Sequence, residues 1–82
     1  MTAKEMFEAL GFKIQFNNEN QLSYLQMNGM APHISVEFDK RNETFIVSAS
    51  SWEYRGSSPH AIDKRMYRII TQQRKELGWL DD

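Results

Sequence analysis

The sequence predicts an α+β domain in which one helix precedes an antiparallel sheet of about four strands and an amphipathic C-terminal helix packs on that sheet. Three observations support this fold class. Both ends of the chain show helical periodicity and finish in Leu-Gly-aromatic, at Leu10-Gly11-Phe12 and Leu77-Gly78-Trp79. The sequence between them alternates apolar and polar residues at strand spacing. Short turns separate these segments, which favours antiparallel pairing.

The first helix begins at a capping box, in which the Thr2 hydroxyl accepts from the Glu5 N–H and the Glu5 carboxylate accepts in return. Its apolar residues recur at i, i+3, i+4 and i+7 and form one stripe: Ala3, Met6, Phe7 and Leu10. Gly11 is placed to end the helix in the left-handed conformation, where a glycine carries no steric penalty.

Four segments show the alternation of a strand. The first runs from Phe12 to Asn17, the second from Gln21 to Asn28, the third from His33 to Asp39, and the fourth contains Phe45, Val47 and Ala49. The polar segment 39–43 suits a hairpin turn. Residues 50–58 leave two options open, because Trp52 and Tyr54 either continue the fourth strand or begin a short fifth one.

The alternation divides the strand residues between two faces of the sheet. The face expected in the core contains Phe12, Ile14, Phe16, Ile34, Val36, Phe38, Phe45 and Val47. Five other apolar residues then form a candidate protein contact on the opposite face: Leu25, Met27, Ile46, Trp52 and Tyr54. Two alternatives stay open, because a β-bulge returns some of them to the core or one helix covers each face. A bare patch of this kind is typical of a partner surface.

The last helix is predicted from about Pro59 to Leu77, with Ser58 as the N-cap and Pro59 as the first helical residue. At about 100° per residue its apolar side chains form one stripe, made of Ile62, Met66, Ile69, Ile70 and Leu77. Gln73 lies within this stripe, so its amide needs a hydrogen-bond partner if it is buried. The outer side carries a candidate nucleic-acid contact: Lys64, Arg65, Arg68 and Lys75. The alternative is an ordinary solvated helix face.

The length of 82 residues allows a single α+β domain, residues 1–82. The net charge of −1 is unevenly distributed, with a net +4 over residues 54–76 and a net −3 over residues 1–53. The chain has no cysteine, which excludes disulfides, thiolate zinc sites and a Cys nucleophile. No apolar run approaches the roughly 18 residues of a membrane helix, and no signal peptide is visible. We therefore expect a cytoplasmic protein without a membrane partner.

No motif indicates an enzyme. The histidines, His33 and His60, lack metal-ligand spacing with Glu37 and Asp39. The four glycines are scattered, so no phosphate loop is present, and the serines form no nucleophile elbow. A thin sheet with two helices also has little room for a cleft. We predict no catalytic residue, no metal, no cofactor and no small-molecule substrate.

Three segments carry a resemblance to a known group: Met6-Phe7-x-x-Leu10-Gly11-Phe12, Ile34-x-x-x-Phe38-Asp39 and Gln72-Gln73-x-x-x-Glu76-Leu77-Gly78-Trp79. Together they resemble a family of small uncharacterised phage and prophage proteins of Gram-positive bacteria. Members of that family have an Ile-Thr-x-x-Glu-Leu-like entry to the last helix, and this chain departs from it over residues 57–62. The resemblance implies an intracellular setting in an infected bacterium, and it carries no assigned activity.

Two functional hypotheses follow from the sequence. The first is a non-enzymatic protein-binding or adaptor module, which contacts a partner protein or a second copy of itself through the five apolar residues. The second is a nucleic-acid-binding protein that uses the basic face of the last helix. The low net charge argues against the second hypothesis, because such modules usually have a high pI.

Overall fold

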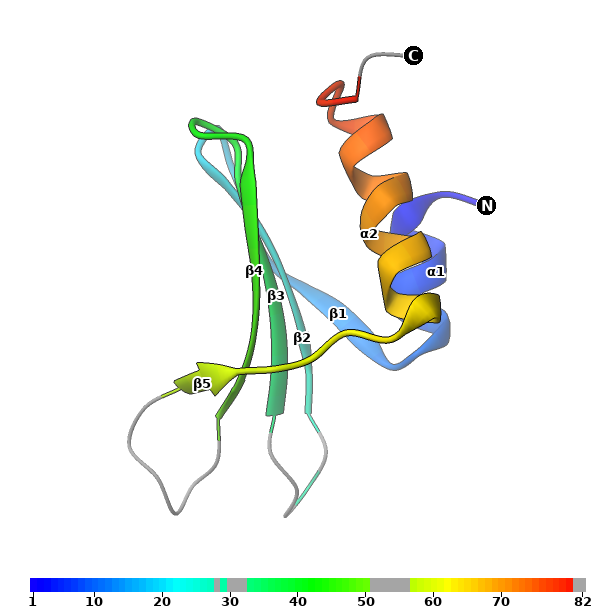
Figure 1. Ribbon diagram of the computed structural model, residues 1–82, viewed down its shortest axis with the longest axis vertical. Helices are drawn as coiled ribbons and strands as arrows, with labels where there is room; N and C mark the ends of the chain where they lie inside the picture. The colour runs from blue at the N-terminus through cyan, green and yellow to red at the C-terminus, as the bar shows by residue number, and fades with distance from the viewer. Residues whose placement is uncertain (28, 30–32, 51–56, 81–82) are drawn as a thin grey trace.

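Two helices lie on one side of a meandering antiparallel sheet in the computed structural model (Figure 1). The structure describes residues 1–27, 29, 33–50 and 57–80. Its elements are α1 (Ala3–Ala9), β1 (Phe12–Asn17), β2 (Gln21–Gln26), β3 (His33–Asp39), β4 (Thr44–Ser50), β5 (Ser57–Pro59) and α2 (Lys64–Glu76). The five strands pair in the order of the sequence. The predicted α+β fold is therefore confirmed, and β5 extends the predicted sheet by a short edge strand.

Helix α1 is capped at both ends as its sequence predicts. The Glu5 N–H donates to the Thr2 hydroxyl over 3.2 Å, and the Thr2 N–H donates to the Glu5 carboxylate over 2.9 Å. The hydrogen bonds that the Thr2 N–H and the Thr2 hydroxyl donate to the carboxylate hold the pKa of Glu5 below its ordinary value. Gly11 ends the helix with a backbone φ of 88°, a conformation that residues with a Cβ rarely adopt.

Strand β1 contains a bulge that changes which side chains enter the core. Ile14 pairs with Tyr24, but the next pair is Phe16 with Ser23, so Gln15 is the extra residue. Directly paired residues share a face of an antiparallel sheet, so Phe16 lies on the face of Ser23 and not on that of Tyr24. The prediction that Phe16 belongs to the core is therefore wrong, and its side chain is 50% exposed. Ile14 keeps the core face but remains 38% exposed at the sheet edge.

The core lies between the helices and one face of the sheet. Phe7 of α1 stacks on Tyr24 of β2 with ring centroids 4.0 Å apart, and Trp79 meets Phe38 edge to face at 6.1 Å. The buried cluster consists of Phe7, Phe12, Leu22, Tyr24, Val36, Phe38, Val47, Ile69 and Ile70. Because residues of α1 and α2 enter the same cluster, the alternative of one helix on each face is wrong.

Helix α2 begins later than the sequence predicts. Its N-cap is Asp63, whose carboxylate accepts from the Met66 N–H over 2.8 Å. Ser58 and Pro59 instead form β5, where they pair with Ala49 and Ser48 of β4. The pairing with β4 holds the backbone of Ser58 and Pro59 in an extended conformation. This pairing overrides the helix-start signal of the Ser-Pro dipeptide, and the helix begins only after Asp63. Ile62, predicted on the apolar stripe of the helix, therefore lies outside it and is 36% exposed.

The end of α2 ties the helix to the core and to α1. Gly78 has a φ of 78°, and the Trp79 N–H donates to the Arg74 carbonyl over 2.9 Å, which together close a Schellman motif. Gln73 is buried, and its amide oxygen accepts from the Tyr24 hydroxyl over 2.6 Å, as its place in the stripe requires. The Glu76 carboxylate accepts from the Ala3 N–H over 2.7 Å, which satisfies a free donor in the first turn of α1.

Neither helix within the described ranges is long and apolar enough to cross a membrane.

Candidate functional site

The face of the sheet that points away from both helices is the main surface left without a covering element in the described part of the chain (Figure 1). We name it the open face. For β1 to β4 the pairing register assigns to it Lys13, Phe16, Gln21, Ser23, Leu25, His33, Ser35, Glu37, Asp39, Thr44, Ile46, Ser48 and Ser50. The bulge residue Gln15 joins them through its hydrogen bond with Ser23. Outside the bulge in β1, these residues alternate along their strands with the side chains of the core, as a period of two requires.

One row of cross-strand neighbours runs through the middle of the open face. Phe16 pairs with Ser23, Ser23 with Glu37, and Glu37 with Ile46. The two apolar ends of this row are exposed, at 50% for Phe16 and 58% for Ile46. Ser23 is fully buried between them, and its hydroxyl donates to the Gln15 amide oxygen over 3.4 Å. The row is therefore apolar at both ends with a carboxylate between them.

The carboxylate of Glu37 has no hydrogen bond or ion pair with any group in the structure, among the residues described. The neighbouring carboxylate of Asp39 differs, because it caps the β3–β4 turn. It accepts from the backbone N–H groups of Arg41 and Asn42 over 2.9 and 3.1 Å and from the Asn42 side chain over 2.8 Å. The Asn42 amide and these backbone donors hold the pKa of Asp39 below its ordinary value. Glu37 is thus the acidic group of this region that remains available to a ligand.

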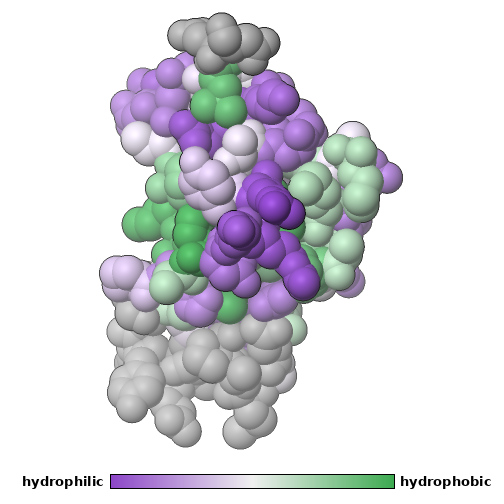
Figure 2. Space-filling model, turned by 45° about the vertical axis from the view of Figure 1, so that its right-hand side comes forward, coloured by the Kyte–Doolittle hydropathy of each residue, from purple (hydrophilic) through white to green (hydrophobic). Residues whose placement is uncertain are grey.

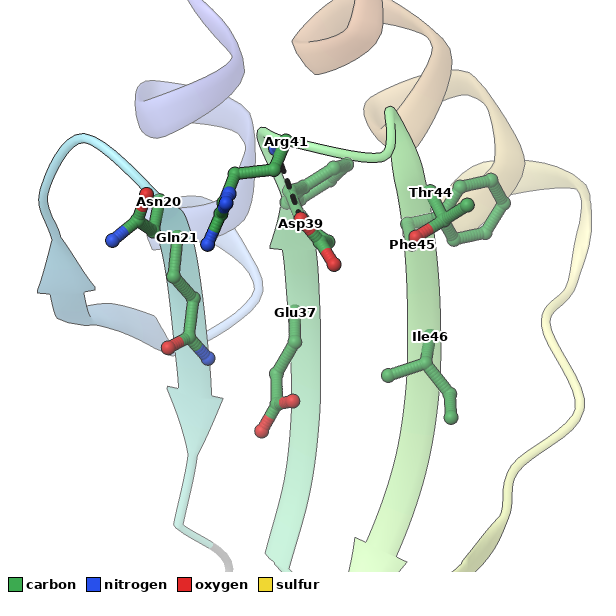
Figure 3. A pocket seen from close by; sticks show the side chains of 9 residues that line it. Asn20, Gln21, Glu37, Asp39, Arg41, Thr44, Phe45 and Ile46 are labelled. Carbon is green, nitrogen blue, oxygen red and sulfur yellow. Dashed lines mark hydrogen bonds between the residues drawn. The ribbon is translucent and has the colours of Figure 1, made fainter.

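A hollow of about 560 Å³ lies at the turn end of the open face. Gln21 of β2, Glu37 of β3 and Ile46 of β4 lie around it, as Figure 3 shows. The remaining lining residues are Asn20, Phe38, Asp39, Arg41, Thr44 and Phe45. The hollow combines an apolar wall with amide groups, the carboxylates of Glu37 and Asp39, and the guanidinium of Arg41. With two carboxylates and one guanidinium, such a lining suits a side chain with an apolar stem and a cationic head.

The other predicted contact residues lie toward the opposite end of the sheet. Leu25 is half-buried and Met27 is 66% exposed, and both line a second hollow of about 300 Å³ with Lys13. Ser35 separates Leu25 from β4 in the paired row, so Leu25 and Ile46 do not form one continuous apolar patch. The predicted contact residues Trp52 and Tyr54 lie outside the described residues.

The four basic residues predicted for nucleic-acid contact are all exposed on the outer side of α2, where Lys64, Arg65, Arg68 and Lys75 face away from the buried stripe. Tyr67, at 56% exposure, lies beside them. Arg74 is different, because its guanidinium lies 5.8 Å from the centre of the Phe45 ring. It is thus held against the sheet instead of joining the outer residues.

The predicted absence of a metal site stays a prediction. Across the ranges that the structure describes, no group of three or more His, Asp or Glu side chains is arranged to hold a metal ion. The side-chain Nε2 of His33 is buried, whereas His60 is exposed. The two histidines therefore lie in different environments at separate places in the sheet region.

Sequence reasoning missed three residues of these surfaces. Strict alternation places Phe16 in the core because it cannot reveal a bulge, although the first strand of a meander lies at the sheet edge, where bulges are frequent. No motif in the sequence singles out Glu37, and only the structure shows that its carboxylate has no partner among the described residues. The exposure of Tyr67 follows from its angle around the helix axis alone, since this angle places it outside the buried stripe.

Comparisons of the chain with models of protein families, with curated proteins and with solved structures find no match of any of the three kinds.

Proposed function

We propose that this protein is a non-enzymatic binding module that uses the open face to hold a short segment of another protein. The observation that carries the proposal is the central row of the open face, in which exposed Phe16 and Ile46 flank Glu37. The Glu37 carboxylate has no hydrogen bond or ion pair with the residues that the structure describes. Both helices pack on the opposite face, so nothing in the described part of the chain covers this row. The row matches a partner that offers apolar side chains on either side of a cation.

Charge complementarity identifies the cation as a lysine or an arginine of the partner. The stem of such a side chain packs against Ile46 while its head reaches Glu37, and the hollow provides the necessary room. A second copy of this chain is a poorer occupant of the face. A two-fold contact centred on the row would bring two Glu37 carboxylates together, and like charges at an interface disfavour association.

The size of the open face also favours a short segment over a folded domain. Strands about 4.8 Å apart with a rise of about 3.3 Å per residue give the four long strands a flat, projected area of roughly 380 Å². A stable interface between folded proteins buries about 800 Å² on each partner. The open face therefore fits a peptide-like segment or a transient contact, and we expect the free protein to be monomeric.

The proposed setting is the cytoplasm of a bacterium that carries a phage or prophage. The resemblance of the helix ends and of the Ile34–Asp39 segment to small phage proteins supports this setting. An adaptor of this kind acts by occupying a host or phage protein and needs no catalytic group.

Capture from a bacterial lysate by point variants tests the proposal. Tagged wild-type protein, Ile46→Asp and Glu37→Lys are compared for the proteins that they retain. We expect each variant to retain at least tenfold less of the partner protein than the wild type does. Ile46→Asp removes the apolar wall, and Glu37→Lys reverses the charge.

Ile62→Asp is the matched control, since it makes the same substitution at an exposed isoleucine outside the open face. It should retain the partner at the wild-type level, and all variants should keep the wild-type melting temperature. The proposal is contradicted if Ile46→Asp retains the same proteins as the wild type, or if no retained protein depends on residue 46.

A further inference from the structure

The outer side of α2 carries a row of cations that the open face does not explain. At 100° per residue, Lys64, Arg68 and Lys75 fall within about 40° of one another, and Arg65 flanks them. The rise of about 1.5 Å per residue places Lys64 and Lys75 roughly 16 Å apart along the helix. We name Lys64, Arg65, Arg68 and Lys75 the basic strip. We propose that the basic strip, together with Tyr67, binds the backbone and a base of a single-stranded nucleic acid.

The basic strip is not neutralised by its own protein. The carboxylate of Asp63 caps the helix through the Met66 N–H, and that of Glu76 accepts from the Ala3 N–H and from the Gln72 side chain. None of the four cations has an ion pair or side-chain hydrogen bond, as far as the described residues go. Their charges are therefore available to an anionic partner.

Helix stability does not account for the position of two of these cations. Lys64 and Arg65 occupy the first turn of α2, which contains no acidic residue. The amide dipoles of a helix make this end positive, so cations are disfavoured there, whereas Lys75 in the last turn is favoured. The acidic group at this end is the N-cap carboxylate of Asp63, which accepts from the Met66 N–H, and the two cations beside it add nothing to helix stability. An anionic ligand removes the conflict, because it is attracted by both the cations and the dipole.

Tyr67 favours a single strand over a duplex. Its ring is 56% exposed, lies one turn from Lys64 and one turn from Thr71, and flanks the basic strip. Proteins that bind single strands combine cations along the backbone with aromatic rings on which bases stack, and bases within a duplex do not offer their faces. Figure 2, in which the side that carries the helices comes forward, shows strongly hydrophilic side chains on that side of the molecule.

Fluorescence anisotropy with a labelled oligonucleotide tests the assignment. The probe is a mixed-sequence DNA or RNA strand of about 12 nucleotides, within the range of site sizes of single-strand binding proteins. Neutralising three or four phosphates predicts a slope of log affinity against log salt of about −2 to −3. Doubly substituted Arg68→Glu with Lys75→Glu should weaken binding at least about tenfold.

Lys13→Glu with Arg41→Glu is the matched control, because it changes the net charge equally at exposed residues on the open-face side of the sheet. It should weaken binding no more than about twofold. Tyr67→Ser should weaken binding about fivefold to tenfold while Tyr67→Phe retains it, since the ring and not the hydroxyl stacks. Ile46→Asp should leave nucleic-acid binding unchanged, which separates this site from the open face.

Three results would overturn the inference. The first is an absence of salt-dependent binding at low salt. The second is an equal loss for the control pair, which would make the attraction a property of overall charge. The third is a preference for a duplex of the same length, or displacement of the strand by polyglutamate at equal charge concentration, because either result removes the role of the exposed ring.

Discussion

The hydroxyl of Tyr24 and the amide of Gln73 form a polar contact inside an otherwise apolar core. Both side chains are at most 5% exposed, and their 2.6 Å hydrogen bond joins β2 to α2. A buried polar group without a partner loses its hydration and regains nothing. The pair therefore specifies how α2 is oriented on the sheet, because only one register of the helix places Gln73 opposite Tyr24.

A double-mutant cycle measures this contact. Tyr24→Phe should lower the free energy of unfolding by about 1–3 kcal/mol, because it leaves the buried Gln73 amide without its donor. Adding Gln73→Met should recover most of that loss, since removing both partners leaves no polar group unsatisfied. Denaturant unfolding of the four proteins checks this, and independent, additive losses would contradict it.

Alkaline pH tests the same hydroxyl. Burial, and then the charges of Glu76 and Glu8, raise the pKa of Tyr24 to about 12 from 10.0. A raised pKa means that the unfolded chain loses the proton first, so stability is intact below about pH 10 and falls as pH rises toward 12. The stability advantage of the wild type over Tyr24→Phe should therefore shrink across this interval. An advantage that stays constant from pH 9 to 12 would contradict the burial of this hydroxyl.

At the scale of elements, two residues compete in the sequence as the N-cap of α2: Ser58, which the sequence favours, and Asp63, which caps the helix in the structure. Asp63→Ala should lower the free energy of unfolding by about 1 kcal/mol, because the Met66 N–H loses its acceptor. Ser58→Ala, at the position that the sequence favoured, should change it by less than about 0.5 kcal/mol. Thermal or urea unfolding of the two variants distinguishes them, and the reverse order of losses would restore the longer helix.

The bulge in β1 makes the two phenylalanines of that strand differ. Phe12 is 2% exposed and Phe16 is 50% exposed, although strict alternation places them on the same face. Phe12→Ala should cost about 3–5 kcal/mol, as expected for emptying a core site. Phe16→Ala should cost less than about 1 kcal/mol, because half of its surface is already in water. Equal losses in chemical unfolding would place Phe16 back in the core.

Much of the architecture was predictable because local signals and packing agree. The capping box at Thr2, the stops at Gly11 and Gly78, and the alternation of Ile34, Val36 and Phe38 each predict the element that the structure contains. The failures occur where pairing overrides a local signal. The register shift after Ile14 and the pairing of β5 with β4 depend on neighbouring strands, which periodicity within one segment does not contain.

The candidate surfaces were less predictable than the fold. The outer position of Lys64, Arg68 and Lys75 follows from helical angles alone, and the structure exposes all three. The composition of the open face depends on the bulge, and the availability of Glu37 depends on its having no partner among the described residues. Both are properties of the folded molecule. An apolar patch was expected, and the described part of the face is instead a mixed surface with Glu37 between apolar ends.

At the scale of the whole molecule, the arrangement of the layers gives the two proposed sites different surroundings. The helices bury one face of the sheet and present the basic strip to solvent, while the open face lies on the other side of the sheet (Figure 1). A protein segment on the open face and a nucleic acid on α2 therefore do not compete for space. Binding at one surface should leave the other accessible.

Site-specific photo-crosslinking decides whether the open face is the binding surface. A benzophenone side chain is introduced at Ile46, and separately at Ile62 and Tyr67 as exposed positions outside that face. Irradiation in the presence of the captured partner should give a covalent adduct from position 46, with little from positions 62 and 67. Adding Glu37→Lys to the position-46 protein should abolish the adduct. An adduct that forms equally from all three positions, or only from position 62 or 67, would contradict a binding site on the open face.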